Sequence, residues 1–290
     1  VIFPTETVYG IGGNANNRKS IELIYKTKNR PINNPLICHF ANMEEIEKNF
    51  ILKDKDYELA NTFWPGPLTL ILEKKINSMI SPLLSNNKNL VGCRIPNNEI
   101  SLSLLSIIDF PIAAPSANIA TRTSVTSIED LDYKLKEIFY IDGGSSVLGL
   151  ESTVIKTTKN GCKILRLGSL TIEDIKIKFP KYEISIDQSD VSPGNQLKHY
   201  SPIKPIRINV DFVNKNETLL NFGINELTSD IKSLNLSINE NLSDASYNFY
   251  NYLNILDNIS CNGIAVAPIP DQGLGKTIND RLRRASYKDE

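Results

Sequence analysis

The sequence predicts an α/β protein with two unequal cores, and three observations lead to this prediction. Over the first 180 residues, short β-rich runs alternate with stretches of helical spacing, which is typical of a mixed sheet layered with helices. From about residue 180 to 205 this periodicity fades into a segment rich in proline, serine and aspartate, and a new alternation begins beyond it. The chain has 290 residues, 41% of them apolar, so it is long enough for one large domain and a smaller one.

The strands of the first unit are expected where apolar and β-branched residues run together. In chain order these runs are Val1–Phe3, Leu36–Phe40, Leu68–Leu72, Val91–Ile95, Ile112–Ala114, Phe139–Ile141, Thr153–Lys156 and Lys163–Leu167. Between the first two runs, Ile21, Ile24 and Tyr25 recur at helical spacing, and Arg30-Pro31 is expected to end that helix. Two further helix starts resemble capping boxes, Ser127 with Asp130 and Thr171 with Asp174.

The second unit carries its own α/β pattern. Strands are expected at Ile206–Val210 and Gly263–Ala267, and one helical face repeats Ala245, Phe249, Leu253 and Leu256. The sequence therefore predicts a first domain over residues 1–179, a linker over 180–205 and a small Rossmann-like α/β domain over 206–290.

Composition excludes several classes of protein. A formal net charge of -1 gives no global attraction to a polyanion, so any RNA contact has to come from a local patch. The four cysteines lack C-x-x-C spacing and only two histidines could join them, which favours idle thiols in a reducing compartment over a zinc site. No run approaches the roughly 20 apolar residues that cross a bilayer, so we expect a soluble, cytoplasmic protein without membrane contact.

Polar groups stand at the beginnings or ends of several of the expected strands, and loops at strand ends are where α/β folds place ligands. They lie in Pro4–Gly10, Pro115–Asn118, Gly149–Thr153 and Leu165–Gly168. Each segment alone suits an ordinary turn equally well, because its hydroxyls and amides can satisfy backbone groups.

Charged residues add a second pattern. Lys26, Lys28 and Arg30 cluster at the end of the first expected helix, where cations complement the helix dipole, but a Lys-x-Arg pair can also hold a triphosphate. Arg94 stands within the apolar run Val91–Pro96, where a charge is costly unless it faces a rim or a carboxylate.

Taken together and in this order, these segments closely resemble the YrdC-like family of threonylcarbamoyl-AMP synthases in its long two-domain form. The resemblance covers nearly the whole chain, and a SPGNQLKHYSP segment at Ser192–Pro202 resembles the linker of the long form. The other markers are FPTETVYGIGG at Phe3–Gly13, KNRPINNPL at Lys28–Leu36, FWPGPLTLIL at Phe63–Leu72, PIAAPSAN at Pro111–Asn118, IDGG at Ile141–Gly144, GLESTVI at Gly149–Ile155 and LRLGS at Leu165–Ser169.

The resemblance implies a nucleotidyltransferase that condenses L-threonine, bicarbonate or CO2 and ATP into threonylcarbamoyl-AMP and pyrophosphate. The product serves the N6-threonylcarbamoyladenosine modification of tRNA, so a downstream tRNA transferase machinery is an expected partner and tRNA itself a candidate. Mg²⁺ is expected with the triphosphate, with no metal ligand from protein side chains. The first domain would be catalytic, and the linker would be an active-site lid.

The resemblance also assigns roles to individual residues. Lys28, Arg30, Ser116 and Asn118 match a catalytic tetrad at the nucleotide and reaction centre. The positions that match the threonine site are Thr7, His39, Arg94 and Ser152. The positions that match ATP contacts are Arg30, Asn34, Asn118, Thr126, Arg166 and Tyr200.

Some features depart from the family pattern and leave alternatives open. The family usually carries a strand and helix before Val1, so we expect residues that precede it. Leu167 replaces a frequent proline, and Gly194–Leu197 replaces the methionine and aromatic or basic residues that members often show. One alternative is a non-enzymatic RNA-binding or ribosome-maturation protein, which the near-neutral charge argues against. Another is a carbamoyl transferase of metallocentre maturation, which would need zinc-finger-like and acylphosphatase-like segments.

Overall fold

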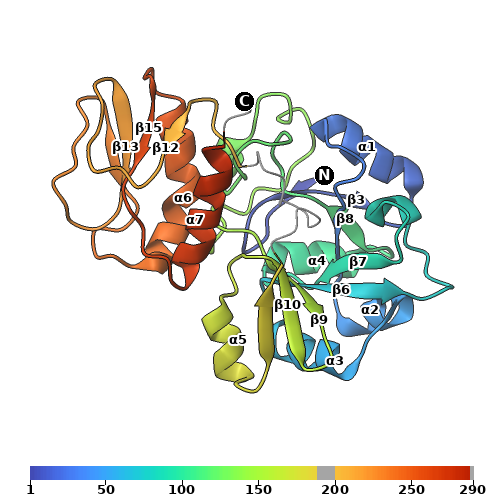
Figure 1. Ribbon diagram of the computed structural model, residues 1–290. Coiled ribbons are helices and arrows are strands. Elements are labelled where there is room, and N and C mark those ends of the chain that lie inside the picture. Colours follow the sequence, from blue (N-terminus) through green and yellow to red (C-terminus); the bar gives the residue numbers. More distant parts are fainter. Residues whose placement is uncertain (188–199, 288–290) are drawn as a thin grey trace.

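The computed structural model describes residues 1–187 and 200–287, which contain two larger sheets with helices packed against them and a separate two-stranded ribbon (Figure 1). The larger sheet has nine strands in the order β11-β10-β9-β6-β7-β4-β8-β3, with β5 paired to β6. Its neighbours run parallel in some pairs, such as β4 with β7, and antiparallel in others, such as β6 with β7. The expected mixed sheet is therefore confirmed.

Short strands and helices alternate along this larger unit. The strands are β1 Ile2–Phe3, β2 Gly10–Ile11, β3 Gly13–Asn14, β4 Ile37–His39, β5 Phe50–Ile51, β6 Leu68–Lys74, β7 Leu90–Arg94, β8 Ile112–Ala114, β9 Thr153–Thr157, β10 Gly161–Arg166 and β11 Glu183–Ile186. The helices are α1 Arg18–Lys28, α2 Met43–Asn49, α3 Asp54–Phe63, α4 Glu99–Ile107 and α5 Ile172–Lys178, with short 3₁₀ turns at Pro82–Ser85 and Ile128–Asp130. β1 and β2 form a separate antiparallel ribbon.

The smaller unit is a parallel sheet of four strands in the order β12-β15-β13-β14. The strands are β12 Ile206–Arg207, β13 Glu217–Asn221, β14 Ser233–Asn235 and β15 Gly263–Val266, and the helices are α6 Leu242–Asp257 and α7 Leu274–Ala285. Both helices lie on the side of this sheet that faces the larger unit (Figure 1). The expected small α/β unit is confirmed.

The first helix shows how local sequence sets its ends. The Asn17 side chain accepts hydrogen bonds from the amides of Lys19 and Ser20, which satisfies two of the free donors at the start of α1. The helix ends at Lys28, before the expected Arg30-Pro31, because Asn29 adopts a left-handed conformation with φ of 50°. Arg30 is thereby turned out of the helix.

The two predicted capping boxes had different outcomes. Thr171 and Asp174 form both reciprocal bonds at the start of α5, as predicted. The prediction of a helix after Ser127 was wrong. Its hydroxyl donates to the Asp130 carboxylate at 3.3 Å instead of capping a backbone amide, and only a 3₁₀ turn follows.

Two strand predictions were wrong, one in the existence of the strand and one in its length. The 139–141 segment is not a strand, since it makes only an isolated bridge between Tyr140 and Ile2. The predicted Ile206–Val210 strand stops at Arg207, because Asn209 takes a left-handed φ of 54° that breaks the extended backbone. In contrast, regular structure extends into the predicted linker, where β11 pairs in parallel with β10.

The two units share an apolar boundary. The core of the smaller unit includes Val8 and Leu150, which belong to the larger one, packed with α6 residues such as Phe249 and Leu253. Consequently the Pro4–Gly10 and Gly149–Thr153 segments lie where the two units meet. Of the predicted linker and lid over 180–205, residues 188–199 lie outside the described residues. Of the helices in the described ranges, none is long and apolar enough to cross a membrane.

Candidate active site

A cavity opens at the edge of the larger sheet, next to the boundary with the smaller unit, and with its mouth encloses about 580 Å³. Strand pairing brings its wall residues together. In β4 and β7, His39 lies directly beside Arg94, while Gly10 bridges to Ser116 just after β8. Eight of the twelve predicted site residues line the cavity: Thr7, Arg30, His39, Arg94, Ser116, Ser152, Arg166 and Tyr200.

One wall is built around Arg94, which is 3% exposed. Its Nη2 lies 2.7 Å from Oε1 of Glu6, its Nη1 donates to the Thr7 hydroxyl at 2.9 Å, and its Nε donates to the carbonyl of Gly66 at 3.2 Å. The Thr7 hydroxyl also lies 2.8 Å from the hydroxyl of Thr5. These contacts hold the guanidinium rigidly. A buried arginine needs a carboxylate to offset its charge, and Glu6 provides that carboxylate.

His39 forms the neighbouring part of this wall. Burial, assisted by the positive charge of Arg94, lowers the pKa of His39 to about 3, so the imidazole is neutral near pH 7. Its Nδ1 has no hydrogen-bond partner among the described residues, although the side chain is only 4% exposed. A buried nitrogen of this kind is a candidate for a ligand contact.

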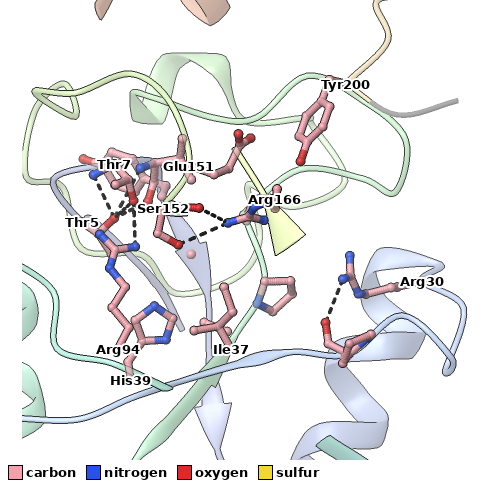
Figure 2. Close-up of a pocket in the computed structure, with 17 residues that line it drawn as sticks. Thr5, Thr7, Arg30, Ile37, His39, Arg94, Glu151, Ser152, Arg166 and Tyr200 are labelled. Atoms are coloured by element: carbon pink, nitrogen blue, oxygen red, sulfur yellow. Dashed lines mark hydrogen bonds between the residues drawn. The ribbon is translucent and has the colours of Figure 1, made fainter. Parts of the chain in front are cut away.

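Ser152 and Arg166 make another side of the cavity, and Figure 2 shows the bonds between them. Nη2 of Arg166 donates to the Ser152 carbonyl at 2.7 Å and to its hydroxyl at 3.2 Å. The Ser152 hydroxyl also lies 2.8 Å from that of Thr69 on β6. Nε of Arg166 is buried and lacks a partner within residues 1–187 and 200–287. This side therefore also offers a donor to a ligand.

Arg30 approaches the cavity from the loop after α1 (Figure 2). Its Nη2 donates to the Asn34 side chain at 2.6 Å and to the Pro35 carbonyl at 3.0 Å, and its Nε donates to the Asn34 carbonyl at 3.0 Å. Burial chiefly, and also the charge of Arg166, lower the pKa of Arg30 to about 10. The group stays cationic at neutral pH, and Asn34 acts here by aiming it.

Lys28 and Asn118 lie behind the cavity wall. The Lys28 ammonium donates to the backbone carbonyls of Ser116 and Asn118, and its side chain is 1% exposed. Burial, and next the charge of Arg30, lower the pKa of Lys28 well below its usual value. The Ser116 hydroxyl donates to the Asn118 side chain at 2.5 Å. The predicted tetrad is therefore brought together, but Lys28 and Asn118 hold the turn that presents Ser116.

The two remaining predicted ATP contacts, Thr126 and Tyr200, differ in their placement. Thr126 does not line the cavity, and its hydroxyl donates to the Asp130 carboxylate at 3.3 Å. Tyr200 does line it, in a left-handed conformation with φ of 61°. A tyrosine in this conformation carries backbone strain that the surrounding packing must sustain.

Two carboxylates at the site were not among the predicted residues. Glu6 pairs with Arg94, and Glu151 lines the cavity beside Ser152. Burial by itself raises the pKa of Glu151, but the guanidinium groups of Arg281 and Arg166 outweigh it and lower the value to about 2. Both glutamates stand within sequence segments singled out for their hydroxyls, and a lone carboxylate among those hydroxyls was the available signal.

The charge around the cavity favours an anionic ligand. Arg30 and Arg166 face it, while both nearby carboxylates are already paired with guanidinium groups. Within the described ranges, no three or more His, Cys, Asp or Glu side chains gather in a way that could hold a metal ion. The cavity can therefore bind phosphate and carboxylate groups through cations and neutral donors.

Comparisons with known proteins agree with this arrangement. Residues 1–168 match the Sua5, YciO and YrdC family model, described as telomere recombination, and residues 170–286 match the model described as threonylcarbamoyl-AMP synthase, C-terminal domain. Threonylcarbamoyl-AMP synthase of Pyrococcus abyssi is 32% identical, over 99% of this chain and 90% of its own. The Bacillus subtilis protein of the same name is 33% identical, over 99% and 89%.

A solved structure extends the likeness to the whole fold. The crystal structure of P. abyssi Sua5 complexed with L-threonine aligns with a TM-score of 0.85 at 30% identity, over 98% of this chain and 89% of that one. Both units of this chain are matched. By its two family segments, its relatives and its fold, the chain belongs to the threonylcarbamoyl-AMP synthase family.

Proposed function

We propose that this protein is an L-threonylcarbamoyladenylate synthase, which condenses L-threonine, bicarbonate or CO2 and ATP into threonylcarbamoyl-AMP and pyrophosphate. The observation that carries the proposal is one cavity with two chemically different sides. Arg94, Thr7 and His39 form a compact polar wall suited to a small amino acid. Arg30 and Arg166 supply separate cations suited to phosphates.

The proposed reaction needs no covalent enzyme nucleophile. The amine of threonine takes up CO2 as a carbamate, and one carbamate oxygen forms a bond to the α-phosphorus of ATP. The bond from that phosphorus to the bridging oxygen breaks, and pyrophosphate leaves with the electron pair. Catalysis then depends on positioning and on charge stabilisation, which cations, hydroxyls and amides provide.

Each wall has a role in this scheme. Arg94 pairs with the threonine carboxylate, while Thr7, His39 and Ser152 contact the rest of that substrate. Arg30 and Arg166 offset the negative charge of the phosphates, and Ser116 is presented to the reacting groups by Lys28 and Asn118. Asn34 orients Arg30. The assignments of Thr126 and Tyr200 to ATP stay predictions.

Mg²⁺ would enter with the triphosphate in this proposal. The two carboxylates beside the cavity, those of Glu6 and Glu151, are each bound by a guanidinium group. The ligands of Mg²⁺ would therefore be phosphate oxygens and water. The product would pass to a downstream enzyme that transfers the threonylcarbamoyl group to tRNA, and direct tRNA binding is a candidate interaction. This class of enzyme is a nucleotidyltransferase, and a cytoplasmic location stays a prediction.

The test is pyrophosphate release from ATP in complete reactions and in reactions from which threonine or bicarbonate is omitted. We expect release only when both are present, with threonylcarbamoyl-AMP as the product. Release that is independent of threonine would rule out the proposal. Binding of RNA without any pyrophosphate release would instead favour the non-enzymatic alternative.

A further inference from the structure

Glu151, on the cavity wall of the larger unit, is held by side chains of the smaller unit. Its Oε2 accepts a hydrogen bond from Nε of Arg281 on α7 at 3.0 Å, and its Oε1 accepts one from the Tyr250 hydroxyl on α6 at 2.8 Å. Ser124 of the larger unit adds a third bond at 2.5 Å. The position of this carboxylate therefore depends on both units.

Arg281 contacts two residues of the cavity wall, Glu151 and Tyr200, and the residue that follows a third, Arg166. In addition to the bond with Glu151, Nη2 of Arg281 donates to the carbonyl of Leu167 at 2.6 Å. Leu167 directly follows Arg166 in the chain. The guanidinium carbon of Arg281 lies 4.5 Å from the centre of the Tyr200 ring, within the range of a cation–π contact. The side chain is 0% exposed, so all of these contacts are made without competing water.

Loss of Arg281 would leave Glu151 buried beside one remaining guanidinium, that of Arg166. An uncompensated buried carboxylate is costly, so Glu151 would be expected to pair more closely with Arg166. In the wild-type structure Arg166 donates to the carbonyl and the hydroxyl of Ser152. Closer pairing with Glu151 would draw Arg166 away from both groups. Tyr200 would lose its cation–π contact with Arg281 in the same change.

We propose that Arg281 is a positioning residue of the cavity, through which the C-terminal unit sets the placement of Glu151, Arg166 and Tyr200 at the nucleotide side. This inference rests on the proposed function. It gives the four-stranded unit a part in forming the site, although Arg281 itself does not line the cavity.

The test compares Arg281→Met with wild type in ATP affinity by calorimetry and in KM for ATP and for threonine. We expect ATP affinity to fall roughly tenfold or more, since small displacements of binding groups have effects of this size. The KM for threonine should change less, because Arg94 is fixed by Glu6 and Thr7 within the larger unit. Arg281→Lys should restore part of the ATP affinity.

Lys276→Ala is the matched control on the same helix. Lys276 pairs with Glu173 of the larger unit at 2.9 Å but does not line the cavity, so its loss weakens the boundary without touching the wall. We expect its ATP affinity to match wild type. An equal loss of ATP affinity in Lys276→Ala and Arg281→Met would mean that Arg281 only stabilises the contact between the two units, which would overturn the positioning role.

A second variant separates charge from packing. In Arg281→Met/Glu151→Gln the unpaired carboxylate is also removed, so ATP affinity should recover relative to Arg281→Met alone. A further loss in the double variant, or wild-type ATP affinity in a folded Arg281→Met, would overturn the proposal. If Arg281→Met does not fold, Arg281→Lys is measured in its place, since it keeps a cation beside Glu151 but loses the guanidinium geometry, and wild-type ATP affinity there would overturn the proposal.

The calorimetric measurement keeps this test apart from that of the proposed function. Threonine-independent pyrophosphate release by the wild-type protein would contradict the synthase assignment alone. Nucleotide binding that is insensitive to Arg281 would contradict the positioning role alone.

Discussion

Glu6 and Arg94 form a 2.7 Å ion pair in which both side chains are only 4% exposed. A buried pair that loses one partner leaves a buried charge, which typically costs about 3 to 5 kcal/mol. We therefore expect Glu6→Gln to lower the free energy of unfolding by about that amount in urea titrations. Glu44→Gln, which breaks an exposed pair with Lys48, should stay near wild type. Equal stability of Glu6→Gln and wild type would contradict this account of the pair.

Arg30 should matter more for turnover than for stability. It lines the cavity, and among the described residues its hydrogen bonds go only to its own loop, at Asn34 and Pro35. Loss of one group that stabilises transition-state charge typically costs roughly a hundredfold in rate, so Arg30→Ala should lower the pyrophosphate release rate by that order. Arg18→Ala, which removes an exposed arginine of α1, is the control. A folded Arg30→Ala with near-wild-type synthesis would show that the assigned role is wrong.

Lys28 is expected to behave differently, although the sequence motif groups it with Arg30. Its ammonium satisfies the backbone carbonyls of Ser116 and Asn118 inside the protein. Lys28→Met should therefore lose stability as well as activity, because those carbonyls would lose a buried donor. A Lys28→Met variant with unchanged melting temperature would argue against this structural part of its role.

Amino-acid selection should follow the hydroxyl of the substrate. The wall formed by Arg94, Thr7 and His39 is polar, and a site built to hydrogen-bond a hydroxyl rejects analogues without one. Serine should support slower pyrophosphate release than threonine. With valine, the rate of pyrophosphate release should be about a hundredfold or more below the rate with threonine. Thr7→Ser keeps the hydroxyl and serves as the control for Thr7→Val. Equal release with valine and threonine would contradict the assignment.

Gly149 is expected to be required for the contact between the two units. It has φ of 73°, and a Cβ there would lie 2.1 Å from the backbone oxygen of Ser246 on α6. Gly144 provides a matched control, since it has φ of 70° but nothing within 4 Å of an added Cβ. Both alanine variants bear a backbone cost of about 1 to 2 kcal/mol, and the clash should cost Gly149→Ala about 1 to 3 kcal/mol more. Equal unfolding free energies would exclude the clash.

His39 should make stability depend on pH in the mildly acidic range. Its pKa is lowered to about 3 when folded, against about 6.5 in the unfolded chain, so below pH 6.5 the unfolded state binds the extra proton. Stability contributed by the neutral imidazole is therefore complete above pH 6.5 and is lost as pH falls toward 3, by up to about 1.4 kcal/mol per pH unit. Between pH 6.5 and 5, the unfolding free energy of His39→Gln should fall less steeply than that of wild type. Parallel slopes would contradict a neutral, buried His39.

Local sequence was sufficient for much of the fold and for most of the cavity wall. Hydrophobic periodicity located β6, β7 and α6, and the Thr171 box gave the start of α5, because these signals depend on neighbours within a few residues. Local signals failed at two places. The Ser127 hydroxyl donates to the Asp130 carboxylate instead of capping a helix, and the left-handed conformation of Asn209 ends a strand that was predicted to continue.

The sequence by itself determined the order of the motifs, the division into two units and the residue types that gather at the site, since these follow from chain-local patterns. Only the tertiary structure decided which of those residues face the cavity and which support it. Lys28 and Asn118 stand in the same motifs as Arg30 and Ser116, yet packing placed them behind the wall. The bond between Glu151 and Arg281 joins residues 130 positions apart. Such a pair carries no local sequence signal, because it exists only once both units have folded against each other.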